Sequence, residues 1–442
     1  MVDMTVGSPR HHLTRFALPL VLGNWLQLSY NAVDTIIAGR FIGQNALAAE
    51  GIAGPVMNLL ILAISGMCIG AGVLMSEAFG AKDSQRLGKI MANTLSVGFL
   101  ACCALAFLGV ILARPILSLL EVPEEIFEIT LIYLRIIFLG TPFTFCYNAL
   151  SAGLKSVGDT DTPLKFLAFS AVLNAGLDIF FLGVLGFGFV CSAMTTVVAE
   201  LVCACLAFIY MLKKFPELIP SPAHWKLDGR ILRQIFQYGG PTALQQAIQP
   251  VCKVLIQSQV NALGVSSIAA FNAVSRMDDF ACIPAQSISS AISTYIAQNR
   301  GGEKMERIRT GFRTGIRLEG CYWLLIGSLT ALLRGPMVRL FVTGDGSEEV
   351  IALGTAYLGW MVLFYLWPAM TNGFQGFFRG MGMMKTTMLA TFLQASIRTV
   401  CTYLLAPRLG ITGIAFSCAI GWSIMLLYEV PYYFVICKRK GL

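Results

Sequence analysis

The chain has 442 residues, of which 56% are hydrophobic and only 13% are charged, and its formal net charge is +8. A soluble domain carries about 25% charged residues, so this composition excludes an ordinary soluble enzyme, and the high hydrophobicity excludes a disordered chain. Long apolar runs, such as residues 59–75, predict membrane-spanning helices, because a helix satisfies its own backbone hydrogen bonds in lipid. A β-barrel would instead show short segments of alternating polarity.

About twelve spanning helices fit in the chain, since each span needs roughly 20 apolar residues and a short connection. The predicted fold is therefore an all-α polytopic membrane protein. In chain order, we predict spans over residues 15–38, 46–76, 90–112, 127–153, 163–186, 189–212, 231–261, 266–297, 314–333, 350–377, 386–406 and 412–436.

The positions of the Lys and Arg residues predict the orientation of these spans. The two ends of the chain and the even-numbered loops carry 23 of the 32 basic residues, the odd-numbered loops carry 5, and the spans hold the other 4. Because basic residues concentrate in cytoplasmic loops, both termini are predicted to be cytoplasmic, in a multi-pass protein of the plasma (inner) membrane. Topology thus explains the positive net charge, and nucleic acid is not expected as a partner.

The two halves of the sequence resemble each other at an offset of about 221 residues, which spans an even number of helices. The segment ALAAEGIAGPV from Ala46 aligns with SIAAFNAVSRM from Ser267. Two lobes of like orientation are typical of secondary transporters that work by alternating access, although a duplication can also serve stability alone. The predicted organisation is a six-helix lobe over residues 1–212, a cytoplasmic linker over 213–230 and a second six-helix lobe over 231–442.

Ionisable residues inside the spans are candidate functional residues, because a charge at mid-bilayer costs roughly 2.5–3.5 kcal/mol. Span 5 carries Asn174 and Asp178 one helical turn apart, while Asp34 lies in span 1 and Thr196 in span 6. All four are expected at a similar depth in the first lobe, where their oxygens would suit Na⁺ or H⁺. Alternatively, Asp34 and Asp178 are separate interface residues, each hydrogen-bonded to a neighbouring helix.

The second lobe carries a different set of polar residues. Span 7 holds Gln249 and Lys253, and span 8 holds Asp278 and Asp279, so Lys253 is placed to pair with either carboxylate. A structural ion pair is one interpretation, and a coupling or substrate role is the other. Pro19 removes a helical hydrogen bond in span 1, which predicts a kink that is either static or a hinge. The candidate substrate cavity adds four polar residues of the first lobe: Gln27, Tyr30, Asn31 and Asn148.

Nothing in the sequence indicates an enzyme. The three histidines, His11, His12 and His224, all fall outside the predicted spans, so no His relay or His metal site is expected within the membrane. No P-loop for nucleotide hydrolysis is present either. We therefore expect no cofactor and no metal other than a coupling Na⁺.

Several motifs occur together in a characteristic order: VDTIIAGRFIG from Val33, SAGLKSVGDTDTPL from Ser151, LNAGLDIFFLGVLGFG from Leu173 and GFFRGMG from Gly376. With them, the sequence resembles the multidrug and toxic compound extrusion (MATE) transporters over essentially the whole chain. The resemblance implies twelve helices in two pseudo-symmetric bundles with a V-shaped cavity. It also implies a monomer that exports small organic cations and drugs against Na⁺ or H⁺.

The family uses a cation site in its first lobe, and its residues correspond here to Asp34, Asn174, Asp178 and Thr196. Some branches carry a coupling Glu in span 7, where this chain has Gln residues and Lys253 instead. The resemblance therefore places the coupling site in the first lobe. The alternative function is a flippase for a lipid-linked cell-envelope precursor, because a diphosphate needs positive groups, and the spans contain Lys253, Arg276 and Arg398.

Overall fold

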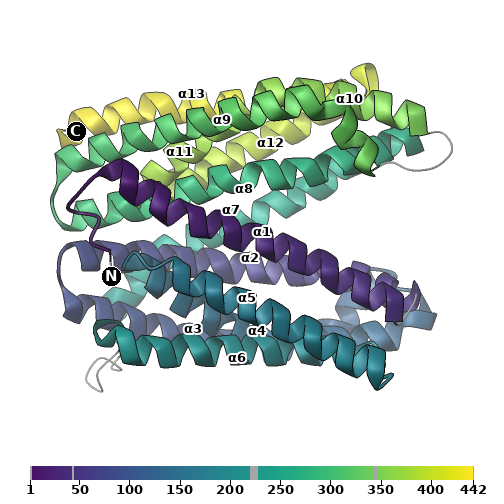
Figure 1. The fold of residues 1–442 in the computed structure, drawn as a ribbon, viewed down its shortest axis with the longest axis horizontal. Coiled ribbons are helices and arrows are strands. Elements are labelled where there is room, and N and C mark those ends of the chain that lie inside the picture. The colour runs from purple at the N-terminus through teal and green to yellow at the C-terminus, as the bar shows by residue number, and fades with distance from the viewer. Residues whose placement is uncertain (1, 42–43, 220–226, 342–346, 442) are drawn as a thin grey trace. The chain divides into compact units, whose positions relative to one another are not determined.

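A computed structural model describes residues 2–41, 44–219, 227–341 and 347–441, and these residues are organised as helices and short connections (Figure 1). A π-helix, η1 (Ile179–Val184), and a 3-10 helix, η2 (Pro216–Leu218), accompany the α-helices. The α-helices are α1 (Pro9–Phe41), α2 (Gln44–Gly80), α3 (Ser84–Leu119), α4 (Glu124–Ser156), α5 (Asp161–Asp178), α6 (Val190–Lys214), α7 (Gly229–Ala262), α8 (Val265–Gly301), α9 (Met305–Phe341), α10 (Ser347–Phe364), α11 (Leu366–Gly380), α12 (Met384–Leu409) and α13 (Ile411–Lys440).

The described helices agree with the twelve predicted spans. Eight of them are long and apolar enough to cross a membrane, and α10 with α11 forms one more span that is broken by a bend of 43°. The long helices α1, α7 and α8 complete the twelve. Their sequences are more polar, and α7 alone carries a series of glutamines that includes Gln245 and Gln249. A polar spanning helix needs a protein or aqueous environment on one face.

The span predicted over residues 350–377 is broken between α10 and α11. Pro368 has no N–H to donate to the carbonyl of Phe364, so the regular hydrogen-bond pattern of α10 stops there. Tyr365 lies at the break, is 5% exposed, and donates its hydroxyl hydrogen bond to Asp278 of α8. This contact ties the bend to α8.

The chain forms two compact units whose boundaries differ from those of the predicted lobes. Unit 1 comprises Met1–Asp3 and Leu22–Ala243, and unit 2 comprises Met4–Val21 and Leu244–Leu442. The first part of α1 thus belongs to unit 2, and the first part of α7 belongs to unit 1. The predicted lobes over residues 1–212 and 231–442, with a cytoplasmic linker over 213–230, stay a prediction.

Specific contacts explain why these helix ends are exchanged. In unit 2, the Met4 N–H donates to Gln298 Oε1 at 2.9 Å, and Lys304 Nζ donates to the Thr5 carbonyl at 2.8 Å. In unit 1, the Asp228 N–H donates to Asn93 Oδ1 at 3.0 Å just before α7 begins. The sequence repeat indicates that a six-helix unit is duplicated, but it does not indicate contacts of this kind near the helix ends.

Small residues allow α2 and α7 to approach closely within unit 1. Gly66 and Gly70 lie one turn apart on α2, in a G-x-x-x-G pattern. A Cβ atom added to Gly70 would lie 2.4 Å from the Gly239 nitrogen, and one added to Gly66 would lie 2.5 Å from the Ala243 Cα. The two backbones are therefore in direct contact, and no larger side chain fits between them.

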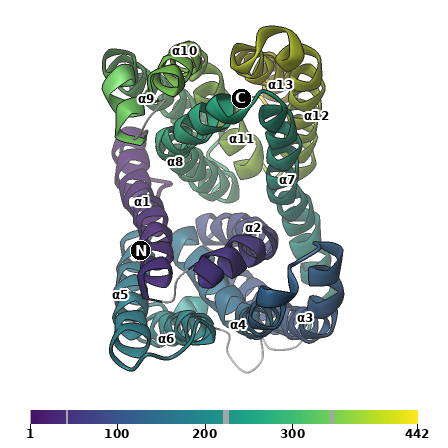
Figure 2. The same cartoon turned by 90° about the vertical axis from the view of Figure 1, so that its right-hand side faces the viewer.

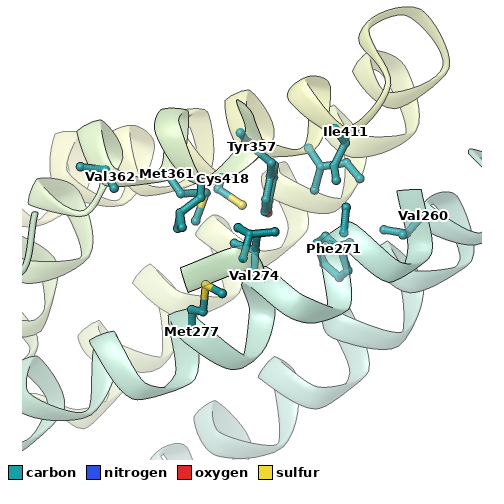
Figure 3. Packing of buried hydrophobic residues seen from close by; sticks show 14 of the residues in the cluster. Val260, Phe271, Val274, Met277, Tyr357, Met361, Val362, Ile411 and Cys418 are labelled. Carbon is teal, nitrogen blue, oxygen red and sulfur yellow. The ribbon is translucent and has the colours of Figure 1, made fainter. Parts of the chain in front are cut away.

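A hydrophobic core of unit 2 is built from α8, α10 and α13 (Figure 3). Phe271, Val274 and Met277 repeat every three residues along one face of α8, which is the spacing of an apolar helix face. They pack with Tyr357 of α10 and Cys418 of α13. Elsewhere in unit 2, α12 runs along α13 and α11 runs along α8 (Figure 2).

Candidate cation site and polar surfaces of the two units

A buried polar cluster lies in unit 1 where α5 meets α6. Asn174 and Asp178 are 1% and 0% exposed, and their four-residue spacing puts both side chains on one face of α5. Thr195 of α6 is also buried, and its hydroxyl donates a hydrogen bond to Asp178 Oδ1. The cluster thus joins a carboxylate to a hydroxyl and an amide, away from solvent.

The amide of Asn174 links this cluster to α1 and to a second threonine. Its nitrogen is assigned to face Asp178 and Tyr30, because this orientation satisfies every neighbour. The nitrogen then donates to Asp178 Oδ2 and to the Tyr30 hydroxyl, both at 3.1 Å. The amide oxygen accepts from the Thr196 hydroxyl at 3.3 Å. The structure therefore brings together three of the four predicted cation-site residues, and Tyr30 joins them.

Asp178 ends α5, and the chain continues directly into the π-helix η1. A π-helical turn is wider than an α-helical turn and is found frequently at functional sites. The change of helix type begins at the residue after the carboxylate; η1 ends at Val184, and two residues later Gly186 has a φ of +68°. Glycine adopts this left-handed conformation without strain.

The fourth predicted residue, Asp34, lies on α1, but its side chain falls outside the part of the chain that the structure describes. Its contact with Asp178 stays a prediction. Two predicted cavity residues of the same helix bond to each other, since Gln27 Nε2 donates to Asn31 Oδ1 at 3.1 Å. Asn148 of α4 donates to the Thr144 carbonyl at 2.8 Å.

Two polar residues of the first lobe, Thr195 and Glu200, are not among the residues predicted from the sequence. Thr195 precedes Thr196, the residue that matches the family pattern, and adjacency in sequence does not tell which hydroxyl reaches Asp178. Glu200 lies one turn beyond Thr196 on α6, and it accepts a hydrogen bond from Thr144 of α4. The four-residue spacing from Thr196 was the available signal for Glu200.

In unit 2, the two adjacent aspartates have separate partners. Lys253 Nζ lies 3.6 Å from Asp279 Oδ2, and these two side chains are 58% and 57% exposed. Asp278 instead accepts from Tyr365. Gln249 is exposed on α7, and α1 continues as a helix through Pro19, so a hinge at this proline stays a prediction.

The exposed Lys253–Asp279 pair should contribute little to stability. In a double-mutant cycle with Lys253→Met and Asp279→Asn, we expect a coupling energy below about 1 kcal/mol, because the atoms are 3.6 Å apart and two long, exposed side chains lose entropy when they pair. Chemical unfolding of the detergent-solubilised protein measures it. The Arg114–Glu128 pair, with side chains 58% and 66% exposed, is a matched control and should give a similar value. A coupling energy above about 2 kcal/mol for Lys253–Asp279 alone would contradict this assignment as a weak surface pair.

Long apolar helices define a polytopic α-helical membrane protein, and a buried oxygen cluster lies in its unit 1. The chain matches the MatE family over residues 19–180 and 241–404, and it belongs to that family of membrane transporters, which are not enzymes.

Relatives with assigned names match nearly the whole chain. The probable multidrug resistance protein YpnP of Bacillus subtilis (strain 168) is 28% identical over 440 residues, which cover 98% of this chain and 96% of the relative. The multidrug export protein MepA of Staphylococcus saprophyticus is 23% identical over 439 residues, covering 97% and 94%. The FAD transporter of Shewanella oneidensis is 25% identical over 377 residues, or 80% of each chain.

Solved structures establish the fold. The outward-facing conformation of a multidrug resistance MATE family transporter of the MOP superfamily has a TM-score of 0.93. A MOP superfamily transporter from Pyrococcus furiosus has a TM-score of 0.91. Both are 18% identical in sequence and cover 100% of this chain and 98% of their own.

Proposed function

We propose that this protein is a secondary active antiporter that exports amphipathic and cationic drugs and toxic organic compounds in exchange for Na⁺ or H⁺. The observation that carries the proposal is the buried, hydrogen-bonded group of Asn174, Asp178 and Thr195 in unit 1. The names of relatives such as YpnP and MepA support multidrug export as the transported chemistry. The protein would act as a monomer with cytoplasmic termini in the inner membrane, without a cofactor.

The cluster has the chemistry that ion coupling needs. Asp178 supplies a carboxylate, Asn174 an amide oxygen, and Thr195 and Thr196 hydroxyl oxygens, which are hard ligands suited to Na⁺. A proton on the carboxylate would neutralise the same charge, so either ion would relieve the cost of burying it. In alternating access, the loaded and empty sites would favour different conformations, and this difference would drive export.

The direct test varies the two gradients independently. Purified protein in liposomes is expected to move ethidium faster when an opposing Na⁺ gradient or pH gradient is imposed. The gradient that accelerates the dye identifies the coupling ion, because an ion drives transport only if it binds the two conformations differently. Collapse of the effective gradient with an ionophore is the control and should return the rate to baseline. A rate of dye transport that is the same with and without each gradient would refute coupled antiport.

A flippase for a lipid-linked precursor is the second candidate function. It is favoured by Arg276, which is exposed on α8 and makes no ion pair within the described part of the chain. A diphosphate headgroup would suit such a free guanidinium. Translocation of a fluorescent polyprenyl diphosphate without any dye transport would select this function over drug export.

A further inference from the structure

Glu319 is a buried carboxyl group that the proposed coupling cluster does not use. It lies on α9, fourteen residues after Met305 and so roughly 21 Å along the helix. Its side chain is 0% exposed, and neither carboxyl oxygen has a hydrogen-bond partner in the described residues. Glu429, also 0% exposed in unit 2, differs because it accepts a hydrogen bond from Gln375 at 2.5 Å.

Close helix packing keeps water away from Glu319. Helix α9 packs against α8, α10 and α11. The contact with α11 is made by Gly373, where an added Cβ would lie 2.4 Å from Ile316 Cδ1 and 3.9 Å from Glu319 Cγ. On the next turn of α9, the Tyr322 hydroxyl donates to the Ala281 carbonyl of α8 at 2.6 Å, so it is turned toward α8.

The surroundings of Glu319 provide no counter-charge. Among the described residues, none of the titratable or charged groups on the packed helices forms a hydrogen bond or ion pair with its carboxyl oxygens. These groups include Arg313, Arg317, Cys321 and Tyr322 on α9, Arg276, Asp278, Asp279, Cys282, Tyr295 and Arg300 on α8, Glu348, Glu349 and Tyr357 on α10, Tyr365 between α10 and α11, and Arg379 on α11.

An ionised carboxylate in such a place would be very unfavourable, since burying an unpaired charge costs several kcal/mol. A bound Na⁺ would need several oxygen ligands, and no described hydroxyl or amide group is hydrogen-bonded to Glu319. A proton needs no further ligand. The neutral carboxylic acid is therefore the form that fits this packing.

We propose that Glu319 is a proton-binding site of unit 2, loaded in this conformation and emptied when α9 and α11 separate enough to admit water. On release, the O–H bond of the acid breaks and the proton passes to water, which leaves the carboxylate hydrated. The site would thus couple proton release to opening of the α9–α11 contact. Its role in transport rests on the proposed antiport, whereas proton binding itself stands on the burial of Glu319.

Infrared spectroscopy and proton counting test this site with Glu319→Gln, a neutral substitution of nearly the same shape. Wild-type protein at neutral pH should show a carboxylic-acid C=O band of a group without hydrogen bonds, and this band should be missing in Glu319→Gln. In liposomes, the variant should exchange about one proton fewer per dye molecule exported, because one titrating group is removed. Its unfolding midpoint should stay close to that of wild type.

Glu306→Gln is the matched control, because Glu306 is an exposed residue in the first turn of the same helix. It should keep both the infrared band and the proton count. A wild-type protein without the band, or a folded Glu319→Gln variant that keeps both signals, would overturn the proposal. If Glu319→Gln does not fold, Glu319→Asp replaces it; this variant keeps the acid and should shift the band, which separates the band from that of Glu429, whose Oε2 is also buried without a partner. If liposomes containing the wild-type protein transport no dye, the proposed antiport is refuted, but the infrared band still tests whether Glu319 binds a proton.

Discussion

Replacement of Asp178 with Asn is expected to lower gradient-driven dye efflux by at least about tenfold, a loss that corresponds to about 1.4 kcal/mol. The amide has nearly the shape of the carboxylate, and its oxygen can still accept the hydrogen bond from Thr195. It carries no negative charge, however, so it neither attracts Na⁺ nor takes up a proton for exchange. The measurement is ethidium efflux from liposomes under the coupling gradient.

The exposed residue Asp161, in the first turn of the same helix, provides the control. Asp161→Asn should keep efflux near the wild-type rate, because a solvated charge at the helix start contributes well under the energy of a buried ligand. Among the hydroxyls, Thr195→Val should impair efflux, and Thr195→Ser should preserve it. If Asp178→Asn still supports most of the wild-type efflux while the protein is folded, the cluster is not the coupling site.

Most of the fold follows from the sequence, because a helix that crosses the bilayer needs an apolar segment of about 20 residues. The exceptions have local causes. Helix α9 begins at Met305, well before the predicted start of its span at residue 314. Arg309, Arg313 and Arg317 recur every four residues on an exposed face, while Ile308 and Phe312 are buried. This amphipathic pattern lets the helix extend beyond its apolar segment, which hydropathy alone does not reveal.

The candidate site was predictable where spacing alone decides the geometry. Asn174 and Asp178 share a face because they are four residues apart on one helix. Adjacent residues are harder to assign, since consecutive side chains on a helix point about 100° apart. Packing therefore determines that Thr195 bonds to Asp178 and that Asp279, rather than Asp278, pairs with Lys253.

Glu319 illustrates a second limit of sequence reasoning. Its burial depends on the close contact between Ile316 and Gly373, which lie 57 positions apart in the chain. No sequence pattern near Glu319 indicates that Gly373 of another helix packs against it. The sequence indicates a carboxyl group within a span, and tertiary packing then decides whether that group is solvated, paired or isolated.

Replacement of Gly70 with Ala should strongly destabilise unit 1. The added Cβ would fall 2.4 Å from the nitrogen and 2.5 Å from the Cα of Gly239, and both of these are backbone atoms. Backbone cannot rotate aside as a side chain does, so α2 and α7 would have to move apart. Overpacking of this kind costs about 1–3 kcal/mol. We therefore expect a lower unfolding midpoint in detergent, measured by intrinsic tryptophan fluorescence.

Gly54→Ala is the matched control on the same helix, because an added Cβ at Gly54 meets nothing within 4 Å. It should leave the midpoint unchanged or raise it slightly, since Ala favours helix by up to about 1 kcal/mol over Gly. Gly66→Ala should behave like Gly70→Ala, because its Cβ would lie 2.5 Å from the Ala243 Cα. Equal midpoints for Gly70→Ala and Gly54→Ala would show that α2 and α7 are not in backbone contact. A selective loss at Gly66 and Gly70 would instead establish this contact as the reason why the first part of α7 belongs to unit 1.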